Sequence, residues 1–441
     1  MLPVDFINGM RKAFPEDVEA LLAALEYVPA VSIRYNPRFS GTGIFETESE
    51  VPWCSNAIFL KERPSFTLDP AFHAGAYYVQ ESSSMFLEQL WKQHVPANKP
   101  LQVLDLCAAP GGKSTHLLSL MGNHSILVAN EPVANRNTVL RQNLAKWGMV
   151  NHIVTQNEPE DFLKAGSVFD VVLIDAPCSG EGMFRKDKNA RKEWSLRNVE
   201  VCEVRQSKIL ENARRLLKPG GLLIYSTCTF EDVENDLQVE RLQSEFDCLR
   251  LSNESVFPEI LRTRWGYAFL PHRVKGEGFY ISCWKKRQGV ESPLLTSRTP
   301  VKMASFEKLT PMVSAPEMVA LEVHDSWRVF PKEHLGLLHH LREHLFIKKA
   351  GAAAGAFKGL DFIPDHELAL TDLVSSAVPR IEVSETTALQ FLKGNAISVS
   401  AENKGWSIIT FRNLQLGWVK VLPNRVNNYY PKNWRILMDV A

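Results

Sequence analysis

The stretch Phe169-Asp-Val-Val-Leu-Ile-Asp-Ala-Pro-Cys-Ser-Gly-Glu-Gly182 contains both a strand signal and a cluster of reactive side chains. Its apolar run from Val171 to Ile174 is typical of a strand buried on both faces of a parallel sheet. The run ends in a carboxylate and a thiol, Asp175 and Cys178, and Pro177 between them stops the strand. Open α/β sheets bind ligands at the carboxyl ends of such strands. We therefore predict a central strand over 169–175 followed by a functional site, with a simple turn as the alternative.

Strands and helices alternate on both sides of this stretch. Upstream we expect a strand from Leu101, a helix over 114–121, a strand over 125–130, a helix over 132–147 and a strand over 152–156. Downstream we expect a helix over 201–217, a strand over 222–229 and a helix over 231–246. Polar residues follow the expected strands: Asp105 with Cys107, Glu131, Glu158, Asp175 with Cys178, and Cys228. The pattern predicts a doubly wound, Rossmann-like α/β fold with one ligand-binding edge.

A glycine-containing turn, Cys107-Ala-Ala-Pro-Gly-Gly-Lys113, joins the first of these strands to its helix. A Walker phosphate loop would need glycine where Cys107 stands, and the dinucleotide pattern G-x-G-x-x-G is also missing. The remaining interpretation is a loop that lies under a compact adenosyl cofactor at a helix start. Glu131, at the end of the next strand, is then a candidate ligand for ribose hydroxyls, and a simple helix-start charge is the alternative.

Two thiols, Cys178 and Cys228, follow what should be neighbouring strands. A lone cysteine at a strand end is usually a small core residue, and an inert buried cysteine lies within a strand, as Cys283 is placed to do. Two thiols on one ligand-binding edge instead indicate nucleophilic catalysis by an activated thiolate. A redox pair is the competing chemistry, although it would not need a cofactor loop.

Composition limits the class of protein. The chain has 441 residues, a formal net charge of zero and seven cysteines. The length predicts two or three domains, and the neutral charge requires that any nucleic acid bind to a local basic face. The cysteines form no C-x-x-C pair, which argues against a disulfide framework and a structural zinc site. We expect a cytoplasmic protein without a signal peptide, a membrane span or a bound metal.

The N-terminal and loop regions give weaker signals. We expect a helix over 15–25 and a strand over 31–37, with Arg34 and Asn36 on its solvated side, in a small α+β appendage over residues 1–75. Residues 182–198 are basic and contain Trp194, so they suit either a solvated loop or a nucleic-acid contact.

The C-terminal third changes in character. Residues 288–325 are rich in Pro, Ser and Thr and are interpreted as a linker, and 326–441 as a β-rich domain with a flexible turn over 348–358. Strands are expected over 396–399, 406–411 and 416–421. The end of this domain interleaves cations with aromatic residues, which suits an RNA face or a solvated strand face equally well. These residues are Lys393, Lys404, Arg412, Lys420, Arg425, Lys432 and Arg435, with Trp418, Tyr429, Tyr430 and Trp434.

Three motifs resemble those of the RNA cytosine-5 methyltransferases of the nucleolar-protein/Sun-domain family, and most of all its bacterial members that act on 16S ribosomal RNA. They are Leu104-Asp-Leu-Cys-Ala-Ala-Pro-Gly-Gly-Lys113, Asp175-Ala-Pro-Cys-Ser-Gly-Glu-Gly182 and Pro219-Gly-Gly…Tyr225-Ser-Thr-Cys-Thr229. The resemblance covers residues 30–287. It implies an S-adenosylmethionine-dependent methyltransferase domain over 76–287, an RNA-binding appendage over 1–75 and a PUA-like RNA-binding domain over 326–441.

The resemblance also implies the roles of individual residues. Cys228 would add to carbon 6 of the cytosine, Cys178 would help to release the methylated product, and Asp175 would bind the cytosine edge and lie near the cofactor amine. Glu131 would bind the ribose. The other implied cofactor-binding residues are Cys107, Ala108, Ala109, Pro110, Gly111, Gly112, Lys113, Arg136 and Glu158, the last replacing the usual aspartate of the family near the adenine.

The implied substrate is a cytosine in ribosomal RNA, most readily 16S, in a single-stranded or looped segment from which the base can leave its stack. A transfer RNA methyltransferase and a non-catalytic RNA-binding ribosome assembly factor are the alternatives. We expect a monomer whose partner is RNA.

Overall fold

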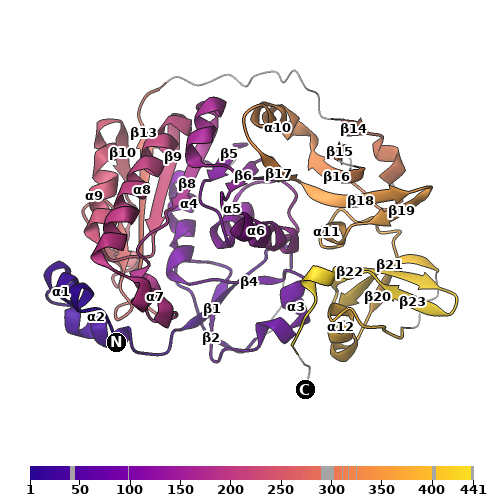
Figure 1. Cartoon of the computed structure of the whole chain (residues 1–441), viewed down its shortest axis with the longest axis horizontal. Helices are drawn as coiled ribbons and strands as arrows, with labels where there is room; N and C mark the ends of the chain where they lie inside the picture. Colours follow the sequence, from indigo (N-terminus) through magenta and orange to yellow (C-terminus); the bar gives the residue numbers. More distant parts are fainter. Residues whose placement is uncertain are drawn as a thin grey trace.

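The computed structural model of this chain describes residues 1–39, 45–97, 99–289, 302–309, 311–315, 317–323, 325–399 and 404–438. A ten-stranded sheet forms its centre (Figure 1). The strand order is β11-β12-β13-β9-β8-β5-β6-β7-β17, and β10 pairs with β13. The strands are β5 Gln102–Asp105, β6 Ile126–Asn130, β7 His152–Thr155, β8 Phe169–Asp175, β9 Leu217–Thr227, β10 Phe246–Leu249, β11 Leu261–Arg262, β12 Tyr267–Phe269, β13 Phe279–Lys286 and β17 Ile347–Ala350.

Strands β5 to β9 run parallel, and β8 lies between β5 and β9. Val171 and Leu173 of β8 point to one face of the sheet and Val172 and Ile174 to the other, all at most 1% exposed. The first pair packs against α4 (Leu87–His94), α5 (Gly112–Leu120) and α6 (Ala134–Trp147). The second pair packs against α8 (Leu196–Leu216) and α10 (Leu335–Arg342). The central strand and the Rossmann-like class are confirmed, because helices cover both faces of a parallel sheet.

Two expected helices differ from the observed ones. The helix expected over 231–246 is interrupted, and α9 spans only Asp236–Val239 between 3₁₀ turns over 232–234 and 240–244. Asn235 has non-helical dihedral angles, and its side chain accepts from Thr227 Oγ1 (2.5 Å) and donates to the Thr229 carbonyl (3.0 Å). The helix is interrupted at Asn235 because its side-chain amide binds the turn after β9 and its backbone is not helical. The helix expected over 15–25 is shorter than predicted, because α2 spans Val18–Ala24, and a further helix, α1 (Val4–Ala13), precedes it.

The N-terminal region forms a four-stranded sheet in the order β2-β3-β1-β4, with β1 Val31–Tyr35, β2 Thr47–Glu50, β3 Ala57–Leu60 and β4 Tyr77–Val79. The solvated face expected for Arg34 and Asn36 is wrong, since they are 1% and 0% exposed. Arg34 donates to Thr115 Oγ1 (2.7 Å) and lies 4.6 Å from the centre of the Trp147 ring, and Asn36 donates to the Trp147 carbonyl (3.0 Å). The polar side of β1 thus faces α5 and α6, and its polar atoms are paired there.

Part of the expected 288–325 linker is instead folded. Within it lie β14 (Met303–Ala304) and β15 (Met318–Val323), which begin a sheet completed by β16 (Ser326–Pro331), β18 (Ala352–Lys358) and β19 (Asp361–Pro364). Leu309 and Val313, 0% and 1% exposed, pack in the core of this unit. The linker prediction is therefore wrong from residue 302 onward, and residues 290–301 lie outside the described residues.

The flexible turn expected over 348–358 is also wrong. Its first residues lie in β17, which pairs with β7 and extends the central sheet, and the rest form β18. Glycines make this close packing possible. A Cβ at Gly351 would lie 2.0 Å from the Val329 carbonyl oxygen, and one at Gly355 would lie 2.3 Å from the Ile363 carbonyl oxygen. The small residues of this segment therefore allow neighbouring strands to pack closely, and they do not indicate a flexible turn.

The last sheet has the order β20-β21-β22-β23, with β20 Arg380–Glu382, β21 Gly405–Phe411, β22 Leu414–Leu422 and β23 Arg425–Asn428. Together with α12 (Glu385–Leu392) it packs against α3 (Pro70–His73) of the N-terminal region (Figure 1). Ile33 of β1 and Phe391 of α12 belong to one hydrophobic core. The expected strand over 396–399 does not form. Trp418 and Tyr430 are 1% and 3% exposed, so these two aromatics belong to the core and not to an RNA face.

None of the described helices combines the length and the apolar character needed to cross a membrane.

Candidate active site

Two adjoining cavities lie at the carboxyl edge of β5, β6, β8 and β9. The first, of about 480 Å³, extends from Glu131 and Glu158 to Cys178. The second, of about 400 Å³, extends from Asp105 and Lys113 to β4 and Phe279. Both are lined by Cys107, Ala109, Pro110, Asp175, Met183 and Cys228. The strand ends singled out in the sequence therefore meet at one site with two compartments.

The two thiols lie together where the compartments join. Cys178 Sγ is 3.1 Å from Cys228 Sγ, and the Cys228 backbone N–H donates to Cys178 Sγ over 3.3 Å. Both cysteines are free and partly buried. The hydrogen bond to Cys228, followed by burial, raises the pKa of Cys178 well above its usual value. Cys178 is therefore held as a protonated thiol beside the sulfur of Cys228.

Glu181 ties together the two loops that hold these thiols, a role that the sequence prediction missed. Its Oε2 accepts from Thr229 Oγ1 and from the Phe230 N–H, both over 2.9 Å, and its Oε1 accepts from Trp194 Nε1 over 2.9 Å. Burial raises the pKa of Glu181 well above its usual value, which favours the neutral carboxyl group. The residue lies within the quoted stretch around Cys178, but its bonds to the second cysteine loop are to residues about fifty positions later.

Substitutions at Glu181 can distinguish whether this side chain acts by positioning the cysteine loops or by carrying a negative charge. We expect Glu181→Ala to lower kcat roughly 10- to 100-fold, because the buried donors Thr229 and Phe230 of the Cys228 loop lose their acceptor. Glu181→Gln should keep most of the activity, since a neutral group already fits the site. The two kcat values and the cofactor Kd test this, and equal loss in both variants would contradict it.

Lys113 and Asp175 form an ion pair that spans the junction. Lys113 Nζ is 2.8 Å from Asp175 Oδ1, and Ser226 Oγ donates to the same oxygen over 2.8 Å. Burial alone would lower the pKa of Lys113, but the Asp175 carboxylate raises it above its usual value. Lys113 Nζ also lies 5.0 Å from the centre of the Phe279 ring. Lys113 was predicted only as part of the cofactor loop, and its bond to Asp175 could not be seen in the sequence.

Glu131 and Arg136 lie on the wall of the first cavity. Glu131, 1% exposed, is 3.2 Å from Arg136 through its Oε2 and accepts from the Val133 N–H over 3.0 Å. Arg136 also donates to the Ala109 carbonyl over 2.8 Å and so ties α6 to the glycine turn. Glu158 lines the same cavity and is exposed, and its backbone N–H donates to Asp161 over 3.2 Å.

The glycine turn lies between the two cavities. Ala108, Gly112 and Lys113 line the second cavity, whereas Cys107, Ala109 and Pro110 line both. Gly111 lines neither. Its φ of +112° is the left-handed conformation that starts α5, and a Cβ there would lie 3.2 Å from Leu140. Gly111 therefore shapes the turn through its backbone and does not face either cavity.

Asp105 is a further site residue that the prediction did not assign. It is fully buried, lines the second cavity and accepts from Ser114 Oγ over 2.6 Å through Oδ2. Its other oxygen, Oδ1, has no hydrogen-bond partner within the described ranges. Burial raises the pKa of Asp105 to about 7. An acceptor left without a partner at the cavity wall is suited to a cationic or N–H donor of a ligand.

The raised pKa of Asp105 predicts a pH dependence of stability. The unfolded chain releases this proton near pH 4, whereas the folded protein holds it until about pH 7. Raising the pH across this window therefore destabilises the ligand-free protein. We expect the free energy of unfolding of Asp105→Asn, relative to the natural protein, to rise between pH 4 and 7 by up to roughly 4 kcal/mol and then to level off. Urea titrations at several pH values test this, and a constant difference would contradict it.

The basic segment 182–198 is largely bound to the protein itself. Arg185 makes a paired contact with Glu277 (2.9 and 3.0 Å), and Arg191 bonds to Glu26 over 2.6 Å. Trp194 is 6% exposed. The nucleic-acid alternative is thus wrong for these three side chains, because acids of the protein already neutralise the arginines and the indole lies in a core.

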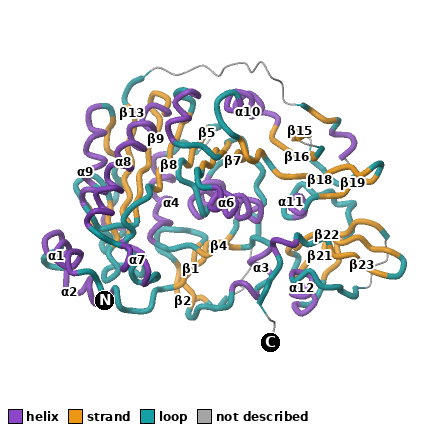
Figure 2. The backbone as a smooth tube through the Cα atoms, in the orientation of Figure 1, coloured by secondary structure: helices purple, strands orange, loops and turns teal. Residues whose placement is uncertain are grey.

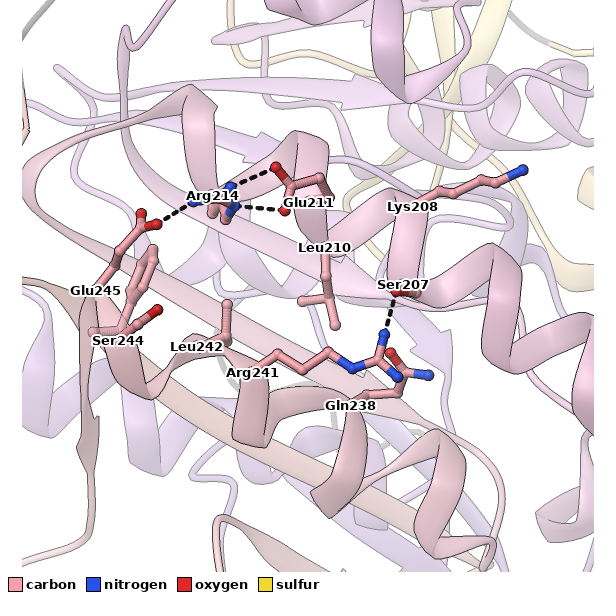
Figure 3. Close-up of a pocket in the computed structure, with 11 residues that line it drawn as sticks. Ser207, Lys208, Leu210, Glu211, Arg214, Gln238, Arg241, Leu242, Ser244 and Glu245 are labelled. Atoms are coloured by element: carbon pink, nitrogen blue, oxygen red, sulfur yellow. Dashed lines mark hydrogen bonds and ion pairs between the residues drawn. The ribbon is translucent and has the colours of Figure 1, made fainter.

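Two other clusters of charged or polar side chains lie outside this site. A cavity of about 370 Å³ beside α8 is lined by paired charges, including Arg214 with Glu211 and Glu245 (Figure 3). Elsewhere the buried side chains of Cys54, Glu88 and His116 lie close enough to share a metal ion. There Lys92 Nζ already lies 2.6 Å from Glu88, and burial lowers the pKa of His116 to about 4. We assign neither cluster to the active site.

Family models match most of the chain. The model "16S rRNA methyltransferase RsmB/F" matches residues 95–285. The model "N-terminal domain of 16S rRNA methyltransferase RsmF" matches residues 2–82, and "Methyltransferase RsmF PUA domain" matches residues 378–436. The PUA match is narrower than the predicted 326–441, and it leaves the sheet of β14, β15, β16, β18 and β19 outside it.

Two relatives over most of the chain carry the same name. The chain is 32% identical over 411 residues to "Ribosomal RNA small subunit methyltransferase F" of Shewanella piezotolerans, covering 87% of this chain and 84% of the relative. It is 31% identical to the protein of the same name from Vibrio cholerae, covering 98% and 97%.

Two solved structures share the fold of this chain. A methyltransferase homologue from Pyrococcus horikoshii has a TM-score of 0.53 and 25% identity, covering 65% of this chain and all of that one. NSun6 from the same organism, in complex with SFG, has a TM-score of 0.55 and 18% identity, covering 65% and 99%.

Proposed function

This chain belongs to the 16S rRNA methyltransferase RsmB/F family, and we propose that it transfers a methyl group from S-adenosylmethionine to carbon 5 of a cytosine in 16S ribosomal RNA. The observation that carries the proposal is the pair of thiols 3.1 Å apart at the junction of two cavities. One cavity suits a cofactor and the other a base. Such an enzyme works in the cytoplasm, where ribosomal RNA is found.

The residues of the first cavity fit S-adenosylmethionine. Its volume of about 480 Å³ is within the range of small-molecule sites. Glu131 offers a buried carboxylate for ribose hydroxyls, and Arg136 and Glu158 line the far end. The carboxylate of Asp175, which lines both cavities, would accept from the cofactor amine, and the unpartnered Oδ1 of Asp105 lies on the second-cavity side of the junction. When bound, S-adenosylmethionine supplies an electrophilic methyl group.

Cys228 is assigned as the nucleophile. Carbon 5 of cytosine is a weak nucleophile, and addition of the Cys228 thiolate to carbon 6 gives it the electron density needed to accept a methyl group. The carbon 6–sulfur bond forms in this step and breaks in the last one, when carbon 5 loses its proton and the thiolate leaves. The buried turn residues Thr229 and Phe230, held by Glu181, keep this sulfur in position.

Cys178 is assigned as the base that removes the carbon 5 proton. The largest cause of its raised pKa is its hydrogen bond to Cys228, and the charge of Cys228 contributes as well. Both causes disappear once the Cys228 sulfur is bonded to carbon 6. Cys178 then becomes easier to deprotonate at the stage of the reaction when a base is needed.

Asp175 is assigned to the cytosine edge. Its Oδ1 is held by Lys113 and Ser226, and the side chain is 36% exposed where the two cavities meet. A carboxylate fixed in this way can hold the cytosine ring and favour its protonated form as charge develops after Cys228 adds. The pairing with Lys113 keeps Asp175 oriented before the base arrives.

Incubation with labelled S-adenosylmethionine tests the proposed function. Unmodified 16S ribosomal RNA would be treated with the protein and digested to nucleosides. We expect the label in 5-methylcytidine at one position. Label in another nucleoside, or only in transfer RNA offered in parallel, would overturn the proposed reaction or substrate respectively.

A further inference from the structure

A third cavity, of about 450 Å³, lies beside the second compartment of the active site. Its walls come from residues 63–67, α3 (Pro70–His73), β4 and the end of α6, which lie close together in Figure 2. The family matches and the roles assigned above leave it unexplained. Arg185 and Arg191 are bound internally, whereas this cavity supplies two cations that could face RNA.

The third cavity adjoins the second compartment of the active site at β4. Tyr78 and Val79 line both cavities. The Tyr78 ring packs against Gly112, where an added Cβ would lie 3.4 Å from the ring. Asn143 donates to the Pro110 carbonyl over 2.8 Å and to Tyr78 Oη over 3.4 Å. One wall of the third cavity is therefore fixed to the turn that borders the catalytic thiols.

The lining combines aromatic rings with cations. The partly exposed rings are those of Phe72 and Tyr78, and the cations belong to Arg63 and Lys146. The buried rings of Phe66, Tyr77 and Trp147 complete the lining. Among the described residues that line this cavity, none is acidic. Aromatic rings beside cations form the arrangement by which proteins stack single-stranded bases and neutralise their phosphates.

Lys146 is a cation without an acidic partner in the described part of the chain. Its Nζ lies 4.6 Å from the centre of the Phe72 ring and 5.7 Å from that of Trp434. Within the described ranges no carboxylate lies within 4.0 Å of Lys146 or Arg63. Burial lowers the pKa of Lys146 to about 8, which reflects the missing counter-charge. An anion in the cavity would supply that counter-charge.

We propose that this cavity binds a nucleotide of the RNA substrate that flanks the target cytosine on the same strand. Its base stacks on the aromatic wall, and its phosphates lie against Lys146 and Arg63. The inference rests on the proposed function and adds to it the path of the strand, from Cys228 along β4 toward α3. A strand held in this way keeps the target base unstacked and directed into the active site.

The double variant Arg63→Gln/Lys146→Met tests the proposal, with in vitro transcribed 16S ribosomal RNA as the probe. We expect KM for RNA to rise roughly five- to tenfold, with little change in kcat and none in the Kd of S-adenosylmethionine. The slope of log binding constant against log salt concentration should fall by about 0.7 for each phosphate that the variant no longer neutralises. Lys285→Met is the matched control. Lys285 is exposed, and it lies on β13 opposite Leu222 of β9, away from the carboxyl edge that holds the active site.

The outcomes separate this proposal from the proposed function. Methylation by the natural protein, with KM and salt slope unchanged in the double variant, would overturn the flanking site alone. No methylation by the natural protein would overturn the proposed function. Arg63 is exposed, so Arg63→Gln alone tests one contact without disturbing the core around Lys146. An equal loss in Lys285→Met would also contradict the proposal, because it would show a general charge effect.

Discussion

Replacing Cys228 with alanine should lower the rate of methyl transfer by about 10⁴-fold or more while leaving the Kd of S-adenosylmethionine within about twofold. The Cys228 sulfur is the atom that activates carbon 5, and the neighbouring Cys178 is assigned as the base and not as a second nucleophile. Cys228 lines the junction of the two cavities but not the Glu131 end, so cofactor binding should survive. Single-turnover methylation and titration calorimetry measure the two effects.

Cys202→Ala is the matched control for this variant. Cys202 is a partly buried thiol on α8, and it lines neither of the two active-site cavities. It should keep the natural rate. Turnover by Cys228→Ala within tenfold of the natural rate would show that Cys228 is not the nucleophile.

Replacing Cys178 with alanine should leave bond formation to RNA intact and block product release, so that the protein stays covalently bound to its RNA substrate. Without the base, the carbon 5 proton remains and the bond from Cys228 to carbon 6 cannot break. A stable protein–RNA adduct should accumulate and migrate as a shifted band under denaturing conditions. The geometry supports this assignment, since the Cys178 sulfur is 3.1 Å from that of Cys228.

The double variant Cys178→Ala/Cys228→Ala is the control for the adduct. It should give no shifted band, because it lacks the sulfur that forms the bond. Normal product release by Cys178→Ala would assign the base to another group. A shifted band in the double variant would show that the adduct forms elsewhere.

Local patterns predicted the centre of the fold well. The apolar run of β8 faces helices on both sides, so its burial can be read from four consecutive residues, and the strand-end residues Asp175, Cys178 and Cys228 meet as expected. These features depend on residues within one strand and its turn. Parallel neighbours bring their carboxyl ends together without further information.

Partnerships across the fold could not be predicted from one sequence. The burial of Arg34 depends on Thr115, about eighty residues away, and Arg185 is neutralised by Glu277. Both arginines look like solvent-facing charges until their partners are known. The linker prediction for residues 302–323 was wrong for a related reason, because their apolar positions are scattered among Pro and Ser and become a core only under β16.

Contacts between residues far apart in the sequence also explain why the site was only partly assigned. Lys113 was predicted only as part of the cofactor loop, and its ion pair with Asp175 joins it to another strand. Asp105 was not predicted as a site residue, and its role comes from an unpaired oxygen at the cavity wall. The aromatic and cationic cavity around Lys146 draws on three separate elements, so no local stretch of sequence contains its pattern.

The central claim is that Cys228 forms the bond to the target cytosine and Cys178 completes the reaction. The most direct measurement uses 16S ribosomal RNA transcribed with 5-fluorocytidine, because a base cannot remove fluorine from carbon 5 as a proton and the adduct is trapped after methyl transfer. Digestion and mass spectrometry would then locate the modified cysteine. We predict one methylated nucleotide attached to the peptide that contains Cys228. An adduct on Cys178, or turnover of unmodified RNA without any adduct on the fluorinated RNA, would contradict the mechanism.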